Sequence, residues 1–215
     1  MVLGVDARPP RVETQPDVVS AVCDLANGAE ATSTLNDLSA RYGPPDVLVN
    51  CAGRIANSPL LKRGPDGWEL HDFALWNDVI ASGLTSAFHA TAACARLMLE
   101  ARRKGVVVNI SSVCASGNPG QVAYSAAKAG LNGLTLALAK ELGPLGIRVV
   151  GLAPGYFETT STTRNVSEAR LAKVTGAVPL KRLGRVAEIA DAIDFIIGNE
   201  YVNGTIVELD GGLVV

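Results

Sequence analysis

The sequence has neither an excess of charge of one sign nor a long apolar run. Its 215 residues include 19 lysines and arginines against 21 acidic residues, which gives a formal net charge of −2. A chain this close to neutrality offers no basic surface for nucleic acid or anionic lipid, so we expect neither as a partner. The longest apolar stretch, 84–99, contains His89 and Arg96 and is too short to predict a membrane span.

Paired cysteines are also missing. The four cysteines, at Cys23, Cys51, Cys94 and Cys114, are widely spaced and form no C-x-x-C pair. The sequence therefore predicts no metal site and no redox motif. We expect the four thiols to be small buried side chains in a reducing compartment. The N-terminus has no basic start and no small-residue cleavage site, so we expect a cytoplasmic protein.

Short apolar runs alternate with longer helical stretches along the whole chain. The runs are rich in Val and Ile and predict strands at 1–6, 17–24, 46–50, 105–111, 146–153 and 204–210. Helical patterns lie between them at 29–43, 68–83, 84–105, 123–143 and 186–198. Runs without polar alternation are typical of a parallel sheet covered on both faces. The sequence predicts an α/β fold in one domain, 1–215, with Trp68 and Trp76 packed in the core.

A tyrosine and a lysine share one face of the clearest helical stretch. Tyr124 and Lys128 are four residues apart, which brings their side chains together on a helix. A nearby ammonium favours the phenolate, so we expect Lys128 to lower the pKa of Tyr124 from its usual value of about 10. Tyr124 would then serve as a proton donor or acceptor near neutral pH. Alone, this spacing is more typical of a solvated helix surface.

Further polar groups and turns follow two of the predicted strands, at the positions where α/β sheets bind ligands. Ser111 and Ser112 come at the end of the Val-rich run, and a hydroxyl there can donate to a substrate oxygen. Only one of two adjacent strand residues can face a site. Pro154 and Gly155 follow the next run and turn the backbone close to the same cleft.

The segments NISSV, AYSAAKAGLNGLTLALAKEL and GIRVVGLAPG together resemble the classical short-chain dehydrogenase/reductase family, which includes the 3-oxoacyl-carrier-protein reductases. The resemblance extends from residue 1 to the LDGG segment at 209–212. It implies a Rossmann-like, doubly wound parallel sheet, and hydride transfer between a nicotinamide cofactor and a carbonyl or secondary alcohol substrate. It also implies a homo-oligomer, either a dimer or a tetramer. The family's catalytic residues fall on Ser112, Tyr124 and Lys128, with Ser111 in reserve because the Ser-to-Tyr spacing is one residue short.

The resemblance also implies a set of cofactor contacts. Asp6 matches the strand-end acid that accepts from the adenosine ribose, which favours NAD over NADP. Arg8 lies beside it and could accommodate a phosphate instead. Tyr124 and Lys128 would hold the nicotinamide ribose. The other matching residues are Asp24 and Leu25 near the adenine, Asn50, Ala52 and Gly53 of the NCAG turn along the adenosine ribose and supporting the central strand, and Pro154, Gly155 and Thr159 at the nicotinamide and diphosphate.

Two positions depart from the family pattern. Gly83 stands where the family has an active-site Asn that kinks the helix and anchors a water leading to the Lys, so we expect lower turnover. The family also has a strand, a Gly-rich turn and a helix before the strand that ends at Asp6, and no G-x-G-x-x-G or G-x-x-x-G-x-G motif occurs in this sequence. We therefore expect an N-terminally truncated sheet, with the first strand and helix missing and a gap beside the strand ending at Asn50.

Three explanations of the second departure are open. These are a start of the chain that is assigned too late, a Val2–Val5 strand that occupies the vacant position, and a loss of nicotinamide binding with Ser, Tyr and Lys kept for another acid–base reaction. Three functions are weighed: an NAD(P)-dependent reductase, a cofactor-independent lyase, dehydratase or isomerase that reuses Tyr124 and Ser112, and a non-catalytic subunit that pairs with a relative. In each case the region 156–180 is expected to shape the substrate pocket.

Overall fold

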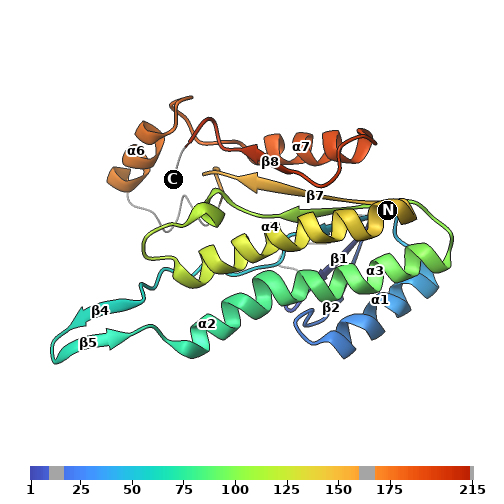
Figure 1. Cartoon of the computed structure of the whole chain (residues 1–215), viewed down its shortest axis with the longest axis horizontal. Coiled ribbons are helices and arrows are strands. Elements are labelled where there is room, and N and C mark those ends of the chain that lie inside the picture. The colour runs from blue at the N-terminus through green and yellow to red at the C-terminus, as the bar shows by residue number, and fades with distance from the viewer. Residues whose placement is uncertain (10–16, 160–167, 214–215) are drawn as a thin grey trace.

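The computed structural model describes residues 1–9, 17–159 and 168–213 (Figure 1). All six predicted strands are confirmed, as β1 (Val2–Asp6), β2 (Val18–Val22), β3 (Val47–Asn50), β6 (Gly105–Ile110), β7 (Ile147–Pro154) and β8 (Ile206–Leu209). The helices are α1 (Gly28–Tyr42), α2 (Phe73–Ile80), α3 (Ser86–Glu100), α4 (Val122–Leu142), α6 (Glu168–Ala177) and α7 (Val186–Gly198). Two further strands, β4 (Leu61–Gly64) and β5 (Gly67–Leu70), were not predicted. None of the described helices is long and apolar enough to cross a membrane.

The centre of the fold is a parallel sheet of four strands in the order β3-β6-β7-β8. Paired residues of parallel strands point to the same face, so Val107 and Val149 face one side while Val108 and Val150 face the other. The first pair packs with buried residues of α3 and α4, and the second pair packs with Ile196 of α7. Figure 1 shows α4 and α7 on opposite sides of β7, so the predicted doubly wound arrangement is confirmed for this sheet.

The first two strands form a separate parallel pair. β1 pairs with β2 from Val2 opposite Val18 to Asp6 opposite Val22. In the described part of the chain neither strand pairs with the four-stranded sheet, so the hypothesis that Val2–Val5 lies in the position next to β3 is wrong. The predicted truncation is likewise not supported, because a first strand is present at Val2–Asp6. The fold is therefore a Rossmann-like α/β sheet.

The helix predicted at 68–83 begins instead at Phe73, because a hairpin occupies its first residues. β4 and β5 pair antiparallel, and the pair Gly64 and Gly67 closes a turn of Pro65 and Asp66. Pro followed by Asp and Gly is a typical turn sequence, since Pro fixes one backbone angle and Gly67 adopts φ 140°. Asp72 then begins α2 by accepting a hydrogen bond from the backbone N–H of Ala74 at 2.8 Å.

A π-helical segment, Ala81–Thr85, joins α2 to α3 and has Gly83 at its centre. A π-helical turn contains one residue more than the α-helical turn that it replaces. The residues of α2 therefore face α4, where Val79 packs with Ala123 and Ala127, while α3 turns its buried face to the sheet. The position of the family's Asn is thus occupied by Gly at the centre of this π-helical segment.

Buried amides and hydroxyls join the sheet to the helices on one side. The Asn50 side chain donates to Thr91 Oγ1 of α3 at 2.9 Å and to Asn109 Oδ1 of β6 at 2.8 Å. The Asn109 amide in turn donates to Thr135 Oγ1 of α4 at 2.9 Å, and Thr135 donates to the Leu131 carbonyl. All four polar side chains are buried. A group that loses its hydrogen-bond partner here is therefore not compensated by water.

We predict that Asn109→Ala lowers the free energy of unfolding by about 2–4 kcal/mol, because it leaves the Asn50 amide and the Thr135 hydroxyl short of a partner in a dry environment. Urea unfolding followed by circular dichroism measures the change. Asn77→Ala, the same substitution at an exposed position of α2, is the matched control and should change stability by less than about 0.5 kcal/mol. Equal effects of the two substitutions would contradict the role given to the buried chain.

Candidate active site

Tyr124 and Lys128 lie side by side near the beginning of α4, as the helical spacing predicts. The Lys128 Nζ is 5.8 Å from the centre of the Tyr124 ring. Lys128 is buried, and its ammonium donates to the carbonyl of Ile110 at the end of β6 at 2.7 Å. The backbone of β6 therefore fixes the lysine at the carboxyl edge of the sheet, beside the phenol.

The pKa values of this pair differ from the prediction. Burial raises the pKa of Tyr124 above its usual value of 10, and a hydrogen bond with Ser112 opposes part of that rise. Burial also lowers the pKa of Lys128 to about 8. The expectation that Lys128 lowers the pKa of the phenol is therefore wrong, because burial of the Tyr124 side chain has the largest effect and raises that pKa. At pH 7 the phenol carries its proton.

The two adjacent serines have different surroundings. Ser112 hydrogen-bonds to Tyr124 and accepts from the backbone N–H of Cys114 at 3.2 Å. Ser111 contacts α4 further along the helix, where its hydroxyl donates to Asn132 Oδ1 at 2.5 Å. The structure thus brings Ser112, and not Ser111, to the tyrosine, as the motif match suggested and the spacing did not.

A chain of side-chain contacts, which the sequence analysis missed, anchors the loop before α4. The Gln121 amide donates to Asn57 Oδ1 at 2.7 Å, and Gln121 and Ser58 form a β-bridge. The Asn118 amide donates to Gln121 Oε1 at 2.8 Å, and its backbone N–H donates to Ser125 Oγ at 3.1 Å. These contacts fix the first turn of the helix that carries Tyr124. Their only signal in the sequence is a cluster of amides just before the Tyr-Lys motif.

Two glycines keep the approach to Lys128 open. A Cβ atom added to Gly53 would lie 3.7 Å from Lys128 Nζ and 3.5 Å from Gly83 Cα. A Cβ atom added to Gly83 would lie 3.4 Å from Ala127 Cβ, which is an ordinary contact. A Cβ atom at position 83 would therefore meet only an ordinary contact, next to Gly53 on the approach to the ammonium. The backbone of the π-helical segment, at Gly83, is the part of the chain that lies next to Gly53.

The NCAG turn lies at the end of β3. Asn50 is buried in the amide chain described above, so its side chain supports the strand. Ala52 and Gly53 are exposed, as cofactor-binding positions must be before a ligand arrives. Cys51 is exposed as well, which contradicts its prediction as a buried side chain, whereas the other three cysteines are buried. Strand Val47–Asn50 ends here, and the thiol emerges into the turn.

A second loop, 154–159, approaches the same edge from β7. The Gly155 N–H donates to the Leu209 carbonyl, and a Cβ atom at Gly155 would lie 2.9 Å from Asp210 Cα, so only glycine fits. Thr159 ends the described part of this loop, and its N–H donates to the Phe157 carbonyl. The predicted pocket region 156–180 is described only in part, because residues 160–167 lie outside the described residues.

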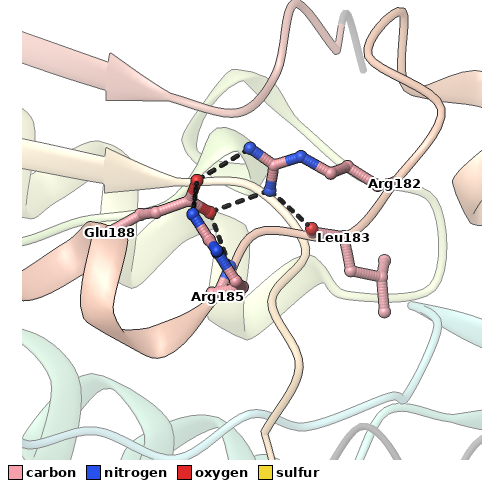
Figure 2. Close-up of polar contacts among 4 residues, drawn as sticks. All are labelled: Arg182, Leu183, Arg185 and Glu188. Carbon is pink, nitrogen blue, oxygen red and sulfur yellow. Dashed lines mark hydrogen bonds and ion pairs between the residues drawn. The ribbon is translucent and has the colours of Figure 1, made fainter.

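An ion-pair network positions α7 next to this loop. Glu188 accepts two hydrogen bonds from Arg182, at 2.7 and 2.9 Å, and one from the backbone N–H of Arg185 (Figure 2). The bonds from Arg182 are the main reason why the pKa of Glu188 falls to about 2. Arg182 and Glu188 line a groove of about 470 Å³ that also includes Tyr156 and Phe157. The groove opens on the side of the sheet covered by α7.

The residues predicted for the adenosine end lie apart from the tyrosine. Asp6 ends β1, is exposed, and accepts from the Arg8 backbone N–H at 2.9 Å. Asp24 accepts from the Ala26 N–H at 2.9 Å, and the Leu25 carbonyl contacts His89 Nδ1 at 3.1 Å, so both shape the turn before α1. Asp6 and Asp24 share the β1–β2 unit, while Tyr124 and Lys128 belong to the larger sheet.

The residues present fit a nicotinamide and its ribose better than a diphosphate. The buried ammonium of Lys128 and the open space at Gly53 suit a ribose with two hydroxyls. No Gly-rich turn followed by a helix N-terminus occurs among the described residues, so the usual diphosphate cradle is not part of the described site. Among the same residues no cluster of His, Cys, Asp and Glu could hold a metal ion.

Comparison with known proteins gives independent evidence for the family and the fold of the chain. A family model described as enoyl-(acyl carrier protein) reductase matches residues 6–214. The chain is 37% identical to the 3-oxoacyl-[acyl-carrier-protein] reductase of Pseudomonas aeruginosa, with 89% of this chain and 75% of that protein covered. It is 36% identical to the (3R)-3-hydroxyacyl-CoA dehydrogenase of Canis lupus familiaris, with 88% and 71% covered.

A crystal structure of a putative gluconate dehydrogenase from Agrobacterium tumefaciens superposes with a TM-score of 0.82 at 30% identity, and covers 91% of this chain and 76% of the other. The fold and the matched sequence therefore agree over nearly the whole chain. On these grounds the chain belongs to the classical short-chain dehydrogenase/reductase family and is an oxidoreductase of that type.

Proposed function

We propose that the protein is a nicotinamide-dependent reductase that converts a 3-oxoacyl thioester to the corresponding 3-hydroxyacyl thioester. The observation that carries the proposal is the juxtaposition of the Tyr124 ring and the buried Lys128 ammonium, 5.8 Å from the ring centre, with Ser112 beside the phenol. The substrate class comes from the relatives, two of which are named for 3-oxoacyl and 3-hydroxyacyl substrates.

The three residues would divide the work of carbonyl reduction. The carbonyl carbon gains a hydride and the oxygen gains a proton, so the site needs an acid at that oxygen. Tyr124 can donate this proton because a phenol is protonated at neutral pH even at its usual pKa of about 10, and burial raises that pKa further. The Ser112 hydroxyl would donate to the same oxygen and stabilise the charge that develops there. The Lys128 ammonium would stabilise the tyrosinate left after transfer.

The cofactor contacts stay part of the proposal. Lys128 and Tyr124 would hold the nicotinamide ribose, with Ala52 and Gly53 beside it and Pro154, Gly155 and Thr159 across the cleft. When bound, the nicotinamide supplies or accepts the hydride. Asp6, Asp24, Leu25 and Asn50 complete the predicted set. We propose NAD ahead of NADP because the Asp6 carboxylate is exposed at its strand end, where it can accept from ribose hydroxyls. A cytoplasmic location and a homo-oligomer belong to the same proposal.

Tyr124→Phe tests the proposed function. With NADH and acetoacetyl-CoA as the probe substrate, we expect kcat to fall at least 100-fold, because the proton donor is removed. The affinity for NADH, followed by fluorescence titration, should change less than about threefold, since the ring stays in place. Tyr42→Phe, at an exposed tyrosine of α1, is the matched control and should leave both unchanged. Turnover that survives in Tyr124→Phe would overturn the proposal, and so would wild-type protein that binds neither NADH nor NADPH.

Lys128→Met tests how the buried lysine changes the pH dependence of stability. The pKa of Lys128 is about 8 in the folded protein and 10.5 in its ordinary state. Between these values the unfolded chain holds more protons, so folded-state stability gains up to about 3 kcal/mol as pH rises through this window. Lys128→Met should lose that gain together with its activity. Urea unfolding at pH 7.5 and 10 measures it, with exposed Lys140→Met as the control; the same pH dependence in all three proteins would contradict the prediction.

Gly83→Asn should raise kcat. A Cβ atom at position 83 meets only an ordinary contact, and Gly83 lies next to Gly53 on the approach to Lys128, so an Asn amide there would hydrogen-bond a water on the path to the ammonium. We expect an increase of about threefold or more with little change in NADH affinity. Gly83→Ala supplies the Cβ atom without the amide and should show no gain. An unchanged or lower kcat in Gly83→Asn, with binding intact, would count against the proposed water path.

A further inference from the structure

The segment 54–58 lies between the NCAG turn and the β4–β5 hairpin, and we call it the strap. It belongs to no helix and to no named strand, yet it is attached to the loop before α4 at two consecutive residues. Asn57 accepts a hydrogen bond from the Gln121 side chain at 2.7 Å, and Ser58 pairs with Gln121 in an isolated parallel bridge. The strap therefore connects the end of β3 to the beginning of the helix that carries the active-site pair.

The middle of the strap packs against that helix. Ala56 is buried in one cluster with Val79 of α2 and with Ala123 and Ala127 of α4. The Tyr124 ring packs against the same cluster. Burial is the main cause of the raised pKa of Tyr124, so this packing contributes to the dry environment of the phenol. A strap that moved away from α4 would open one side of the cluster.

The hairpin that follows the strap does not bury its own tryptophan. Trp68 of β5 is 65% exposed, which contradicts the prediction that it packs in the core. Trp76 of α2 packs against the cluster that contains Ala56, in agreement with its prediction. The strap, and not the hairpin, therefore supplies a buried residue to the cluster against which Tyr124 packs.

Gln121 connects the strap to the first turn of α4. Its side-chain amide donates to Asn57, and its Oε1 atom accepts from the Asn118 amide at 2.8 Å. Its backbone carbonyl accepts from the Ser125 N–H at 2.8 Å, in the first turn of the helix. Both ends of the Gln121 amide are used, so the side chain is fixed in one orientation. We call the side-chain pair of Asn57 and Gln121 the latch.

The latch is also connected to Ser112. The Asn118 amide, which donates to Gln121, lies 3.6 Å from Cys114 Sγ, and the Cys114 N–H donates to Ser112 Oγ at 3.2 Å. Ser112 in turn hydrogen-bonds to Tyr124. The loop that begins at Ser112 and the helical turn that carries Tyr124 are thus joined a second time, through Asn118 and Gln121. The relative position of the two hydroxyls depends on this second connection.

We propose that Gln121 is a positioning residue for proton transfer by Tyr124. Through the latch it keeps the strap on α4 and the Tyr124 hydroxyl beside Ser112. A proton donor must lie within hydrogen-bond reach of the atom that it protonates, and a displacement of about 1 Å can cost about 100-fold in rate. An open latch therefore slows the reaction although every catalytic residue is present. The inference rests on the proposed function, which assigns Tyr124 as the proton donor.

Two conservative substitutions and their combination test the latch. In Asn57→Asp the carboxylate still accepts from Gln121, and in Gln121→Glu the Asn57 amide can rotate and donate to the carboxylate. The double variant places two carboxylates opposite each other, so the latch opens by repulsion. Each single variant carries one added negative charge and keeps the latch, and the two singles are therefore the matched controls for the double variant.

The kinetic measurement uses NADH and acetoacetyl-CoA at pH 7.5. We expect kcat to stay within about threefold of wild type in each single variant and to fall at least about tenfold in the double variant, well beyond the product of the single effects. The affinity for NADH should change less than about threefold in all variants. The NCAG turn is held independently of the latch, by the Asn50 side chain and by the ion pair of Arg54 with Asp78.

Acid should close the latch again in the double variant. Repulsion raises the pKa of one of the two facing carboxyls, so near pH 5 they share a proton and a hydrogen bond re-forms between them. The ratio of wild-type to double-variant kcat should then narrow to less than about threefold. A variant that is merely misfolded would not recover in acid.

Hydrogen exchange gives a measurement that does not depend on turnover. The amides of residues 122–128, at the beginning of α4, should exchange faster at pH 7.5 in the double variant alone, whereas those of α7 should be unchanged in all four proteins. Additive effects on kcat, or a double variant with wild-type kcat, would overturn the positioning role. So would a loss of kcat that persists near pH 5.

A wild-type protein that turns over no substrate would contradict the proposed function and not the latch. Hydrogen exchange then decides between the two remaining outcomes. Faster exchange at 122–128 in the double variant alone would support the attachment of the Tyr124 turn by Gln121, and equal exchange in all four proteins would overturn it.

Discussion

The hydrogen bond between the buried side chains of Asn50 and Asn109 is the constraint on which the site depends. It joins β3 to β6 at the carboxyl edge of the sheet, and its continuations to Thr91 and Thr135 attach α3 and α4 to the same two strands. Amides in a dry interior accept only a narrow range of geometries. The strand end that supplies Ser112 and the helix that supplies Lys128 are therefore held in one register before any ligand binds.

The positive charge of Lys128 is energetically unfavourable in this well-packed interior. Its ammonium is buried, and the main compensation is the carbonyl of Ile110, so the pKa falls to about 8. A buried cation with partial compensation is a cost in stability that a purely structural position would not retain. Desolvation also raises the pKa of Tyr124. Both effects are suited to a site that stabilises negative charge only when it forms on the phenol, in the course of a reaction.

Local chemistry predicted much of the fold, and long-range packing accounts for what was missed. The six strands follow from Val-rich runs, and the pairing of Tyr124 with Lys128 follows from helical spacing alone. The hairpin was missed because its alternating apolar residues were read with a helical period, although Pro65, Asp66 and Gly67 are a turn signal. The rise in the pKa of Tyr124 depends on burial by segments distant in sequence, which no motif contains. Ser112 was assigned by motif, whereas counting residues to the tyrosine favoured Ser111.

The π-helical segment at Ala81–Thr85 sets a limit on how this chain can vary. It inserts one residue between two helices, which turns everything after it by about 100° relative to an uninterrupted helix. That offset lets Val79 face α4 while Thr91 reaches Asn50. Deleting a single residue here would rotate Thr91 away from its amide and expose the alanine face of α3. The segment thus cannot change its length by one residue without breaking these contacts.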